Sequence, residues 1–512
     1  MKVRSITYFF SAGSLDEAVV GMKGAAAALA TSKAKVTAAG FDVQTVRVAT
    51  NSFEEFLSGS TNDMVAGLNE LEQAAHDIDF ISVGPAERRL DVLEEALSGS
   101  TQKTFFNIPL NLCSRSGLPD QTAALQAAQT VCNLGAKAPA KTKDVPSVFR
   151  LTVTANLAAG TPYFPGGFWE QGRPPALAIA LEDTGILTEA FKGAASLEAA
   201  QAALEKQLSD ALLPLEKAGK EAAQAAGVTY AGIDCSIASS DAPTESLVVA
   251  YESLGLGPFG GAGTLSISAM VTAVLKRLRV THTGYSGLMM PVTEDAGLAA
   301  RASQGAISVQ QLLFYSAVCG TGVDTVPIEG STPPARLAAV YLDMASMAFR
   351  LKKPLSARLW PVAGKKAGDM TEVDNSFFVN SKVLTVDPPE PHMAVQQDCL
   401  AVVDEVAGVE GDIVVLSNAP EALVVQLKDQ AAGIVFVMRN SGRVPWPEAT
   451  ALCASPGFSE AENIEVPAAL PGESVTAVLA FPRLSTGSGS LRYRLTAMGA
   501  EFGPALILIR AA

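Results

Sequence analysis

The sequence contains few of the residues that most often support metal or nucleophilic chemistry. Only three histidines occur in 512 residues, and no pair has the spacing of metal ligands, so zinc sites and Ser-His-Asp arrangements are disfavoured. The six cysteines lie far apart and include no Cys-x-x-Cys pair, which favours reduced and mostly buried thiols over a disulfide framework. Carboxylates, lysines and backbone amides are therefore the expected chemical groups.

Basic charge and long apolar runs are also lacking. The chain has 38 Lys and Arg against 52 Asp and Glu, a formal charge of -14, which disfavours a phosphate-backbone partner. No run approaches the roughly 18 apolar residues of a membrane helix, and the apolar run at residues 6–10 is too short for a signal-peptide core. We expect a cytosolic protein with neither nucleic-acid nor membrane partners.

Apolar residues are abundant, at 48% of the chain, and predict a globular protein with one large and one smaller domain. Over residues 1–385, strand-like runs alternate with amphipathic helical runs, the pattern of an α/β domain. We predict strands over 3–10, 41–49, 77–86, 148–157, 176–183 and 355–362, and helices within 15–39, 51–75, 87–99, 120–134, 184–226 and 333–350.

The amino-acid composition changes near residues 386–400, where the stretch DPPEPH is acidic and rich in proline. This segment is the predicted linker. Beyond it, over 401–512, short apolar runs such as GIVFVMRN and ALILIR are separated by clusters of Gly, Pro, Ser and Asn. That spacing predicts an all-β module of the sandwich type.

The stretch CGTGVDTVPI, residues 319–328, combines a thiol, two glycines and a carboxylate. The glycines permit a tight turn and Asp324 can bond to nearby amides, so a structural turn is one explanation. The other is an active-site loop, in which Cys319 becomes a nucleophile only if a neighbouring cation lowers its pKa.

A second candidate loop follows the strand predicted at 355–362. It contains Lys365, Lys366 and Asp369, with Arg358 in the strand itself. Loops at the carboxyl ends of strands often hold ligand groups in α/β folds, so this loop is either an anion site or a solvated turn.

Further polar residues lie in short glycine-containing stretches. They are Asp234 in GIDCSIASS, and Tyr285, Ser286 and Glu294 in GYSGLMMPVTED. Each one alone is more typical of a cap or a turn than of a catalyst.

These stretches together resemble one family. GYSGLMMPVTEDAGLAARA, YSAVCGTGVDTVPIEG and KPLSARLWPVAGKKAGD, preceded by VRSIT, VRVAT, SVGPA, TPYFPG and GIDCSIA, are similar to domain of unknown function 711, also called UPF0210. The resemblance covers about residues 1–385. It implies a large α/β barrel similar to pyruvate formate-lyase, with two related halves and loops that enter the interior. The chain lacks a matching glycyl-radical segment, so no glycyl radical is expected, and the cofactor is left open.

The C-terminal part resembles a different module. MRNSGRVPWPEATAL, ALPGESVTAVLAFP and LRYRLTAMGAEFGPAL follow the pattern of the four-tryptophan domain of the autophagy receptor Next-to-BRCA-one. The resemblance implies an immunoglobulin-like sandwich that binds a protein partner. Trp446 is the tryptophan retained, and Tyr493 stands where another is expected.

Two hypotheses of function follow. In the first, the barrel is an enzyme-like body that holds a small anionic metabolite through Arg358, Lys365 and Lys366, with Asp369, Tyr285 and Ser286 as further ligand-binding residues. Its candidate catalytic residues are Cys319, Asp324, Asp234 and Glu294. In the second, the protein is a non-catalytic interaction protein, docked by its sandwich in a cytoskeletal or ciliary assembly. Neither hypothesis requires a metal, and a homo-oligomer is compatible with both.

Overall fold

The structure is a computed structural model that describes most of the chain: residues 2–114, 116–139, 141–143, 145–182, 184–238, 243–375, 377–387, 401–409, 413–419, 422–427, 433–440, 446, 451–454, 464–470, 473–480, 489–497 and 500–510. The chain divides into two compact units, Met1–Pro388 and Pro389–Ala512. Each is described by itself. The described part of the chain has no helix long and apolar enough to cross a membrane.

The first unit is built on a mostly parallel sheet of nine strands, in the order β8-β7-β1-β2-β3-β4-β6-β10-β9. The strands are β1 (Lys2–Phe9), β2 (Asp42–Ala49), β3 (Phe80–Pro85), β4 (Thr104–Leu110), β6 (Leu151–Ala155), β7 (Ala176–Glu182), β8 (Thr229–Asp234), β9 (Gly322–Glu329) and β10 (Leu355–Val362). All seven residues of β7 are buried, as expected for a central strand covered on both faces.

The strands form two sets of opposite direction. Five neighbours, β1, β2, β3, β4 and β6, are mutually parallel, and they meet β7 and β10 in antiparallel pairings. The pairs β7–β8 and β9–β10 are parallel again. The sheet is not flat, because residues 282–291 make isolated bridges to both of its edges: Ile233 with His282 and Ile237 with Leu288 on one side, and Pro291 with Asp324 on the other. The first unit is therefore an α/β barrel-like domain.

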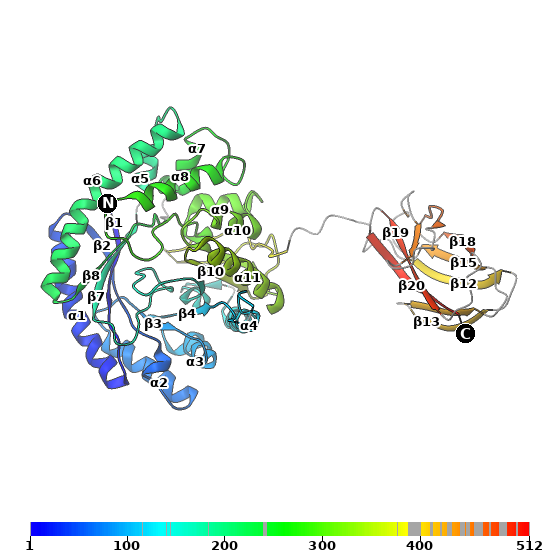
Figure 1. The fold of residues 1–512 in the computed structure, drawn as a ribbon, viewed down its shortest axis with the longest axis horizontal. Helices are drawn as coiled ribbons and strands as arrows, with labels where there is room; N and C mark the ends of the chain where they lie inside the picture. The colour runs from blue at the N-terminus through cyan, green and yellow to red at the C-terminus, as the bar shows by residue number, and fades with distance from the viewer. Residues whose placement is uncertain are drawn as a thin grey trace. The chain divides into compact units, whose positions relative to one another are not determined.

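Helices lie on the outside of this sheet, as Figure 1 shows for α1, α2, α3 and α6. The eleven α-helices of the described chain are α1 (Leu15–Ala38), α2 (Thr61–Ala74), α3 (Leu90–Glu95), α4 (Gln121–Lys137), α5 (Gly185–Phe191), α6 (Leu197–Ala226), α7 (Leu247–Glu252), α8 (Thr264–Arg277), α9 (Ala296–Ser303), α10 (Val309–Ser316) and α11 (Pro334–Leu351). Local signals set their ends: Ser14 caps α1 by accepting from the N–H of Glu17, and α6 ends at Gly227 with φ 69°.

The interior of the barrel is occupied by the loop between β6 and β7. The hydroxyls of Ser5 and Thr7 on β1 donate to the carbonyl of Pro162, at 3.4 and 3.3 Å. Ser82 on β3 donates to the carbonyl of Gly167 at 2.6 Å. Polar side chains on the inner face of the sheet thus hold a loop that would otherwise carry unpaired backbone groups into a buried space.

Most predicted elements are confirmed, with local differences. The helices predicted at 15–39, 120–134 and 333–350 are α1, α4 and α11, and the run 184–226 is two helices, α5 and α6. Strands β4, β8 and β9 were not predicted. In CGTGVDTVPI only the first three residues are a turn, because residues 322–329 form β9 and are buried over most of their length.

In the second unit the described strands belong to two sheets. One has the order β12-β15-β18 and the other β13-β14-β20-β19-β16-β17. Most neighbours are antiparallel, and β14 and β20 are parallel. The strands are β12 (Ala401–Val409), β13 (Ile413–Ala419), β14 (Ala422–Leu427), β15 (Gly433–Asn440), β16 (Ala451–Ala454), β17 (Ile464–Glu465), β18 (Ser474–Ala480), β19 (Gly489–Ala497) and β20 (Ala500–Arg510). The predicted linker lies mostly outside the described residues.

Candidate functional site

A break in the ladder between β9 and β10 marks the centre of the candidate site. Pairing passes from Val323 with Ala357 to Val326 with Leu359, so Asp324 and Thr325 together stand opposite the single residue Arg358. Thr325 has φ 43°, a strained backbone conformation for a β-branched residue. Such bulges change where a side chain points and are frequent beside active sites.

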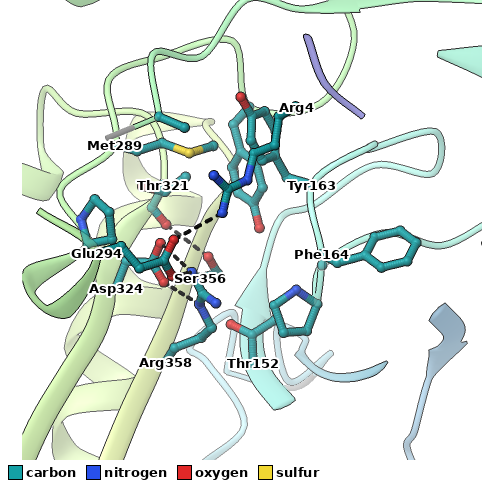
Figure 2. Close-up of a pocket in the computed structure, with 15 residues that line it drawn as sticks. Arg4, Thr152, Tyr163, Phe164, Met289, Glu294, Thr321, Asp324, Ser356 and Arg358 are labelled. Atoms are coloured by element: carbon teal, nitrogen blue, oxygen red, sulfur yellow. Dashed lines mark hydrogen bonds and ion pairs between the residues drawn. The ribbon is translucent and has the colours of Figure 1, made fainter. Parts of the chain in front are cut away.

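Five charged side chains from four strands and one short helix form a continuous chain of ion pairs. Arg358 donates to both oxygens of Asp324 and, at 3.0 Å, to Glu294 of η5 (Val292–Glu294). Arg4 on β1 donates to Glu294 at 3.1 Å and to Glu182, at the end of β7, at 2.7 Å. Figure 2 shows Arg4 and Arg358 on either side of the Glu294 carboxylate.

In this series of ion pairs, the carboxylates keep both arginines protonated. Burial alone would lower the pKa of Arg358, but Asp324 and Glu294 outweigh it and raise that pKa. Burial likewise opposes the charge of Arg4, whose pKa is nevertheless raised by Glu294 and Glu182. Both guanidinium groups are therefore charged and already neutralised by protein carboxylates.

An inner pocket lies beside this chain and is rich in hydroxyl groups. Its lining includes Thr152, Tyr285, Thr321 and Ser356 as well as Arg4, Glu294, Asp324 and Arg358. The Thr321 hydroxyl is buried and has no hydrogen-bond partner among the described residues. Burial raises the pKa of Tyr285, so its phenol stays protonated at neutral pH. The inner pocket thus offers neutral donors beside two carboxylates, Asp324 and Glu294, that are paired with arginines.

A larger cavity of about 290 Å³, called here the outer chamber, adjoins the inner pocket. Arg4, Phe164, Glu294 and Arg358 line both spaces. The outer chamber reaches the surface, because Gln44, Gln102 and Phe377 in its wall are exposed. Its charged lining consists of four arginines and one glutamate: Arg4, Arg47, Arg150, Arg358 and Glu294. Because carboxylates already neutralise Arg4 and Arg358, the net positive charge of this lining comes from Arg47 and Arg150.

Two of these arginines have no carboxylate within ion-pair distance among the described residues. Arg47 on β2 is 6% exposed, and its Nε donates to the Thr45 hydroxyl at 2.9 Å. Arg150 donates at 3.2–3.3 Å to a hydroxyl and two backbone carbonyls. Burial and the neighbouring Arg4 lower the pKa of Arg47 to about 9, and burial lowers the pKa of Arg150 to about 10. Both side chains are thus buried cations that an anion would stabilise.

Of the residues predicted from sequence to form the site, four come together here. Glu294, Asp324, Arg358 and Tyr285 all line the inner pocket. They come from β9, β10, the bridging segment 282–291 and the adjoining η5, which explains why distant stretches of sequence converge.

Asp234 has a structural position instead. It is fully buried, and its oxygens accept from the hydroxyl and N–H of Ser236 and from the N–H groups of Tyr285 and Ser286, at 2.6–3.0 Å. Burial raises its pKa, while these donors oppose the shift. Ser286 holds the same loop, since its hydroxyl accepts from the N–H of Cys235 and donates to the carbonyl of Thr283. Both residues therefore position the loop that carries Tyr285.

Cys319 is buried beneath the site and does not line either cavity. The residue is 1% exposed, and its thiol accepts from the N–H of Gly322 at 3.4 Å. The neighbouring Gly320 lies against Gly287, where a Cβ on either residue would stand 2.4–2.5 Å from backbone atoms of the other. Glycine is thus required where the two loops cross. The cation nearby is Lys353, which donates to the backbone carbonyl of Cys319.

The loop after β10 lies outside both cavities. Lys365 is paired with Glu372 at 2.6 Å, and the Asp369 carboxylate accepts from the N–H of Lys366 within the turn. Residues 364–369 thus form a surface turn, which is also held by Glu329 and Val383. Neither lysine contributes to the lining of the outer chamber.

Several site residues were missed from the sequence although a signal was present. Arg4, Arg47 and Arg150 each interrupt an apolar, strand-like run, in VRSIT, VRVAT and FRLTV. An arginine within a buried strand needs either a partner or a cavity. That rule would have identified three of the four arginines of the outer chamber, and Arg358 in SARLW is the fourth.

In the second unit, Trp446 and Tyr493 are 2% and 3% exposed. Their rings thus belong to the interior of the unit, and a partner would meet the surface around them. In the described part of the chain, no three His, Cys, Asp or Glu side chains gather as metal ligands would.

Two comparisons with known proteins agree on one family. A family model described as Uncharacterised ACR (DUF711) matches residues 1–374. The chain is 29% identical over 325 residues to a UPF0210 protein of Pyrobaculum arsenaticum, covering 62% of this chain and 70% of that protein. It is 30% identical to one of Pyrobaculum aerophilum, covering 62% and 68%. A solved endo-beta-1,4-mannanase from Thermotoga petrophila, 8% identical over 98% of this chain and 97% of that one, has a TM-score of 0.15, which supports no argument about the fold.

Proposed function

Because the chain belongs to the DUF711 (UPF0210) family of uncharacterised proteins, we propose from its cavities that the barrel-like unit binds a small anionic metabolite in the outer chamber. The observation that carries this proposal is Arg47, a buried arginine that lines the chamber without a carboxylate partner among the described residues. Arg150, which lines the same chamber, supports the proposal. An anion that reaches these groups replaces the water they lose on burial.

The other arginines of the chamber contribute less attraction, because Arg4 and Arg358 are paired with Glu182, Glu294 and Asp324. Their role is to separate the outer chamber from the inner pocket. Asp324 and Glu294 are the proposed proton-transfer groups, since they are the two carboxylates that line the inner pocket. Cys319 and Asp234 are not needed for this proposal.

The finer fold assignment is also a proposal. Five parallel strands meet a second parallel set through two antiparallel pairings, and residues 282–291 bridge the remaining edges. This arrangement supports the two related halves that the resemblance to the pyruvate formate-lyase-like barrel implies.

The proposal is tested with the full-length chain by calorimetric titration and thermal unfolding against inorganic phosphate, acetate, malate, benzoate and phenylphosphate. At least one of these anions should raise the unfolding temperature in a saturable manner. In Arg47→Met, binding of that anion should weaken by at least about tenfold, since a hydrogen-bonded charge is worth about 1.5–3 kcal/mol. The control is Arg279→Met, which removes an exposed arginine and should leave binding unchanged.

The same variant has a second readout that needs no ligand. Removing an unpaired buried charge should leave the ligand-free protein as stable as the wild type or more stable. Arg47→Met is therefore expected to keep or raise the unfolding temperature while losing the anion. The proposal fails if none of the anions binds, or if Arg47→Met binds them as the wild type does.

The alternative, an interaction protein docked through residues 401–512, stays a prediction. No described feature favours a cytoskeletal or ciliary partner, and the two aromatic residues expected to bind it are buried.

A further inference from the structure

The outer chamber is unusually rich in phenylalanine. Six of the 21 phenylalanines of the chain line it: Phe80, Phe105, Phe149, Phe164, Phe377 and Phe378. Arginine is the other residue type that it gathers. A chamber for a bare anion would need the arginines and polar groups but no aromatic wall.

The rings form two groups. Phe105 lies 5.2 Å from Phe80 and 5.7 Å from Phe164 between ring centroids, and these three residues come from β3, β4 and the loop that fills the barrel. Phe149 and Phe378 are stacked at 5.2 Å with an angle of 23°. Edge and face contacts of this kind are the ones that aromatic rings prefer, and a further ring can join either group.

Five of the six rings are incompletely covered by the protein, whereas Phe149 is 1% exposed. Phe80, Phe105, Phe164 and Phe378 are only partly buried, and Phe377 is 55% exposed. Aromatic surface left in contact with water is unfavourable, and an apolar ligand that covers it recovers that free energy. The exposed faces therefore point to an occupant with an apolar surface.

The cationic group of Arg47 lies beside two of these phenylalanine rings. The Arg47 guanidinium stands 5.4 Å from the ring centroids of both Phe80 and Phe164. This position, typical of cation–π contacts, keeps the cation beside the rings. A ligand whose anionic group binds Arg47 thus places its body among the phenylalanines.

Size limits that body. An apolar cavity of about 150 Å³ holds one benzene ring, and the outer chamber measures about 290 Å³. One ring with an anionic substituent fits within this volume.

Building on the proposed function, we infer that the ligand of the outer chamber is an aromatic anion: a single planar ring that carries a carboxylate or a phosphate. Arg47 and Arg150 bind the anionic group, and the ring lies against the phenylalanines. The substrate class is thus narrower than small anions in general.

Matched probes separate the ring from the charge. Calorimetric titration of the full-length chain compares benzoate with acetate, and phenylphosphate with methyl phosphate. The ring-bearing anion should bind at least about tenfold more tightly in each pair, and benzoate should bind more tightly than cyclohexanecarboxylate and than uncharged benzamide. Whichever of benzoate and phenylphosphate binds more tightly then shows whether the chamber prefers a carboxylate or a phosphate.

Two variants test the wall. Phe105→Leu keeps an apolar side chain and should weaken benzoate by at least about fivefold without weakening acetate. Phe377→Ala changes an exposed residue and should weaken benzoate without lowering the unfolding temperature. The control is Phe314→Leu, which alters an exposed ring on α10 that is outside the lining, and it should bind as the wild type does.

A failure of the aromatic inference can be distinguished from a failure of the proposed function. If benzoate and acetate bind equally and both depend on Arg47, the aromatic inference is wrong and the proposed function stands. Equal binding of benzoate and benzamide, or of benzoate and cyclohexanecarboxylate, also overturns the inference. If no anion binds through Arg47, the proposed function itself falls.

Discussion

Arg358 on β10 donates hydrogen bonds to both carboxylate oxygens of Asp324 on the neighbouring strand β9. The two residues meet where β9 bulges, and the same guanidinium also donates to Glu294. Asp324 and Arg358 are each largely buried, so each depends on the other for compensation of its charge. The pair thus fixes the geometry of the wall between the inner pocket and the outer chamber.

Breaking this pair should destabilise the first unit. Asp324→Asn leaves Arg358 with Glu294 as its remaining carboxylate partner in the described structure, and loss of one member of a buried pair costs about 3 kcal/mol. Calorimetric unfolding of the full-length variant should show a lower transition temperature. Asp343→Asn, which alters an exposed residue of α11, is the matched control. Equal unfolding of both variants and the wild type would contradict the importance of the pair.

Replacement of glycine by alanine should have opposite effects at Gly320, where two loops cross, and at Gly24, which lies in open space on a helix. Gly320→Ala introduces a Cβ about 2.5 Å from the Gly287 backbone and should destabilise by about 2 kcal/mol or more. Gly24→Ala lies within α1, where no atom is within 4 Å of the new Cβ, and should stabilise by about 0.5–1 kcal/mol. Urea unfolding measures both, and a stable Gly320→Ala would show that the crossing is wrong.

The helices and several strands followed from the sequence because their signals are local. Ser14 with Glu17 at the start of α1, and Gly227 at the end of α6, are caps that can be identified without any tertiary contact. Strand β9 was missed because Gly322, Asp324 and Thr325 are typical of turns. Its identity as a strand depends on pairing with β10, and such pairing overrides local propensity.

The site residues likewise divide into those that could be predicted from local motifs and those that depend on tertiary contacts. Glu294, Asp324 and Arg358 were proposed from their motifs and do converge. The buried arginines of the outer chamber carry a sequence signal, but their convergence does not, because Arg47, Arg150 and Phe378 come from distant segments and line one cavity only in the folded unit. Lys365 shows the converse, since its ion pair with Glu372 removes a plausible anion-binding group from the site.

A pH-dependent stabilisation is predicted at Glu54, whose side chain is 4% exposed. Its carboxylate accepts from the N–H groups of residues 87–89 and from the Arg88 guanidinium. Burial opposes its ionisation, but these donors prevail and lower the pKa of Glu54. The folded pKa lies below the unfolded value of about 4.3, so the stabilisation is complete above that value and is lost as pH falls through the folded one.

Glu54→Gln should therefore cost about 1–2 kcal/mol at pH 7, and the difference from the wild type should shrink below about pH 4. Urea unfolding across this pH range measures it, with the exposed Glu70→Gln as the control. A difference that stays constant with pH would contradict the assignment.

Four of the six cysteines of the chain, those of the first unit, provide a direct test of whether Cys319 is a nucleophile. Cys113 is exposed, Cys132 is partly buried with a pKa raised to about 11 by burial, and Cys235 and Cys319 are buried. A pulse of iodoacetamide at pH 7, followed by peptide mass mapping, should label Cys113 first. Cys319 should be slower on the order of 100-fold and should react only as the unit opens. In urea all four should react alike, which serves as the control for detection. Labelling of Cys319 in the native protein as fast as Cys113 would instead mean that its thiolate is accessible and activated, and would restore it to the list of catalytic candidates.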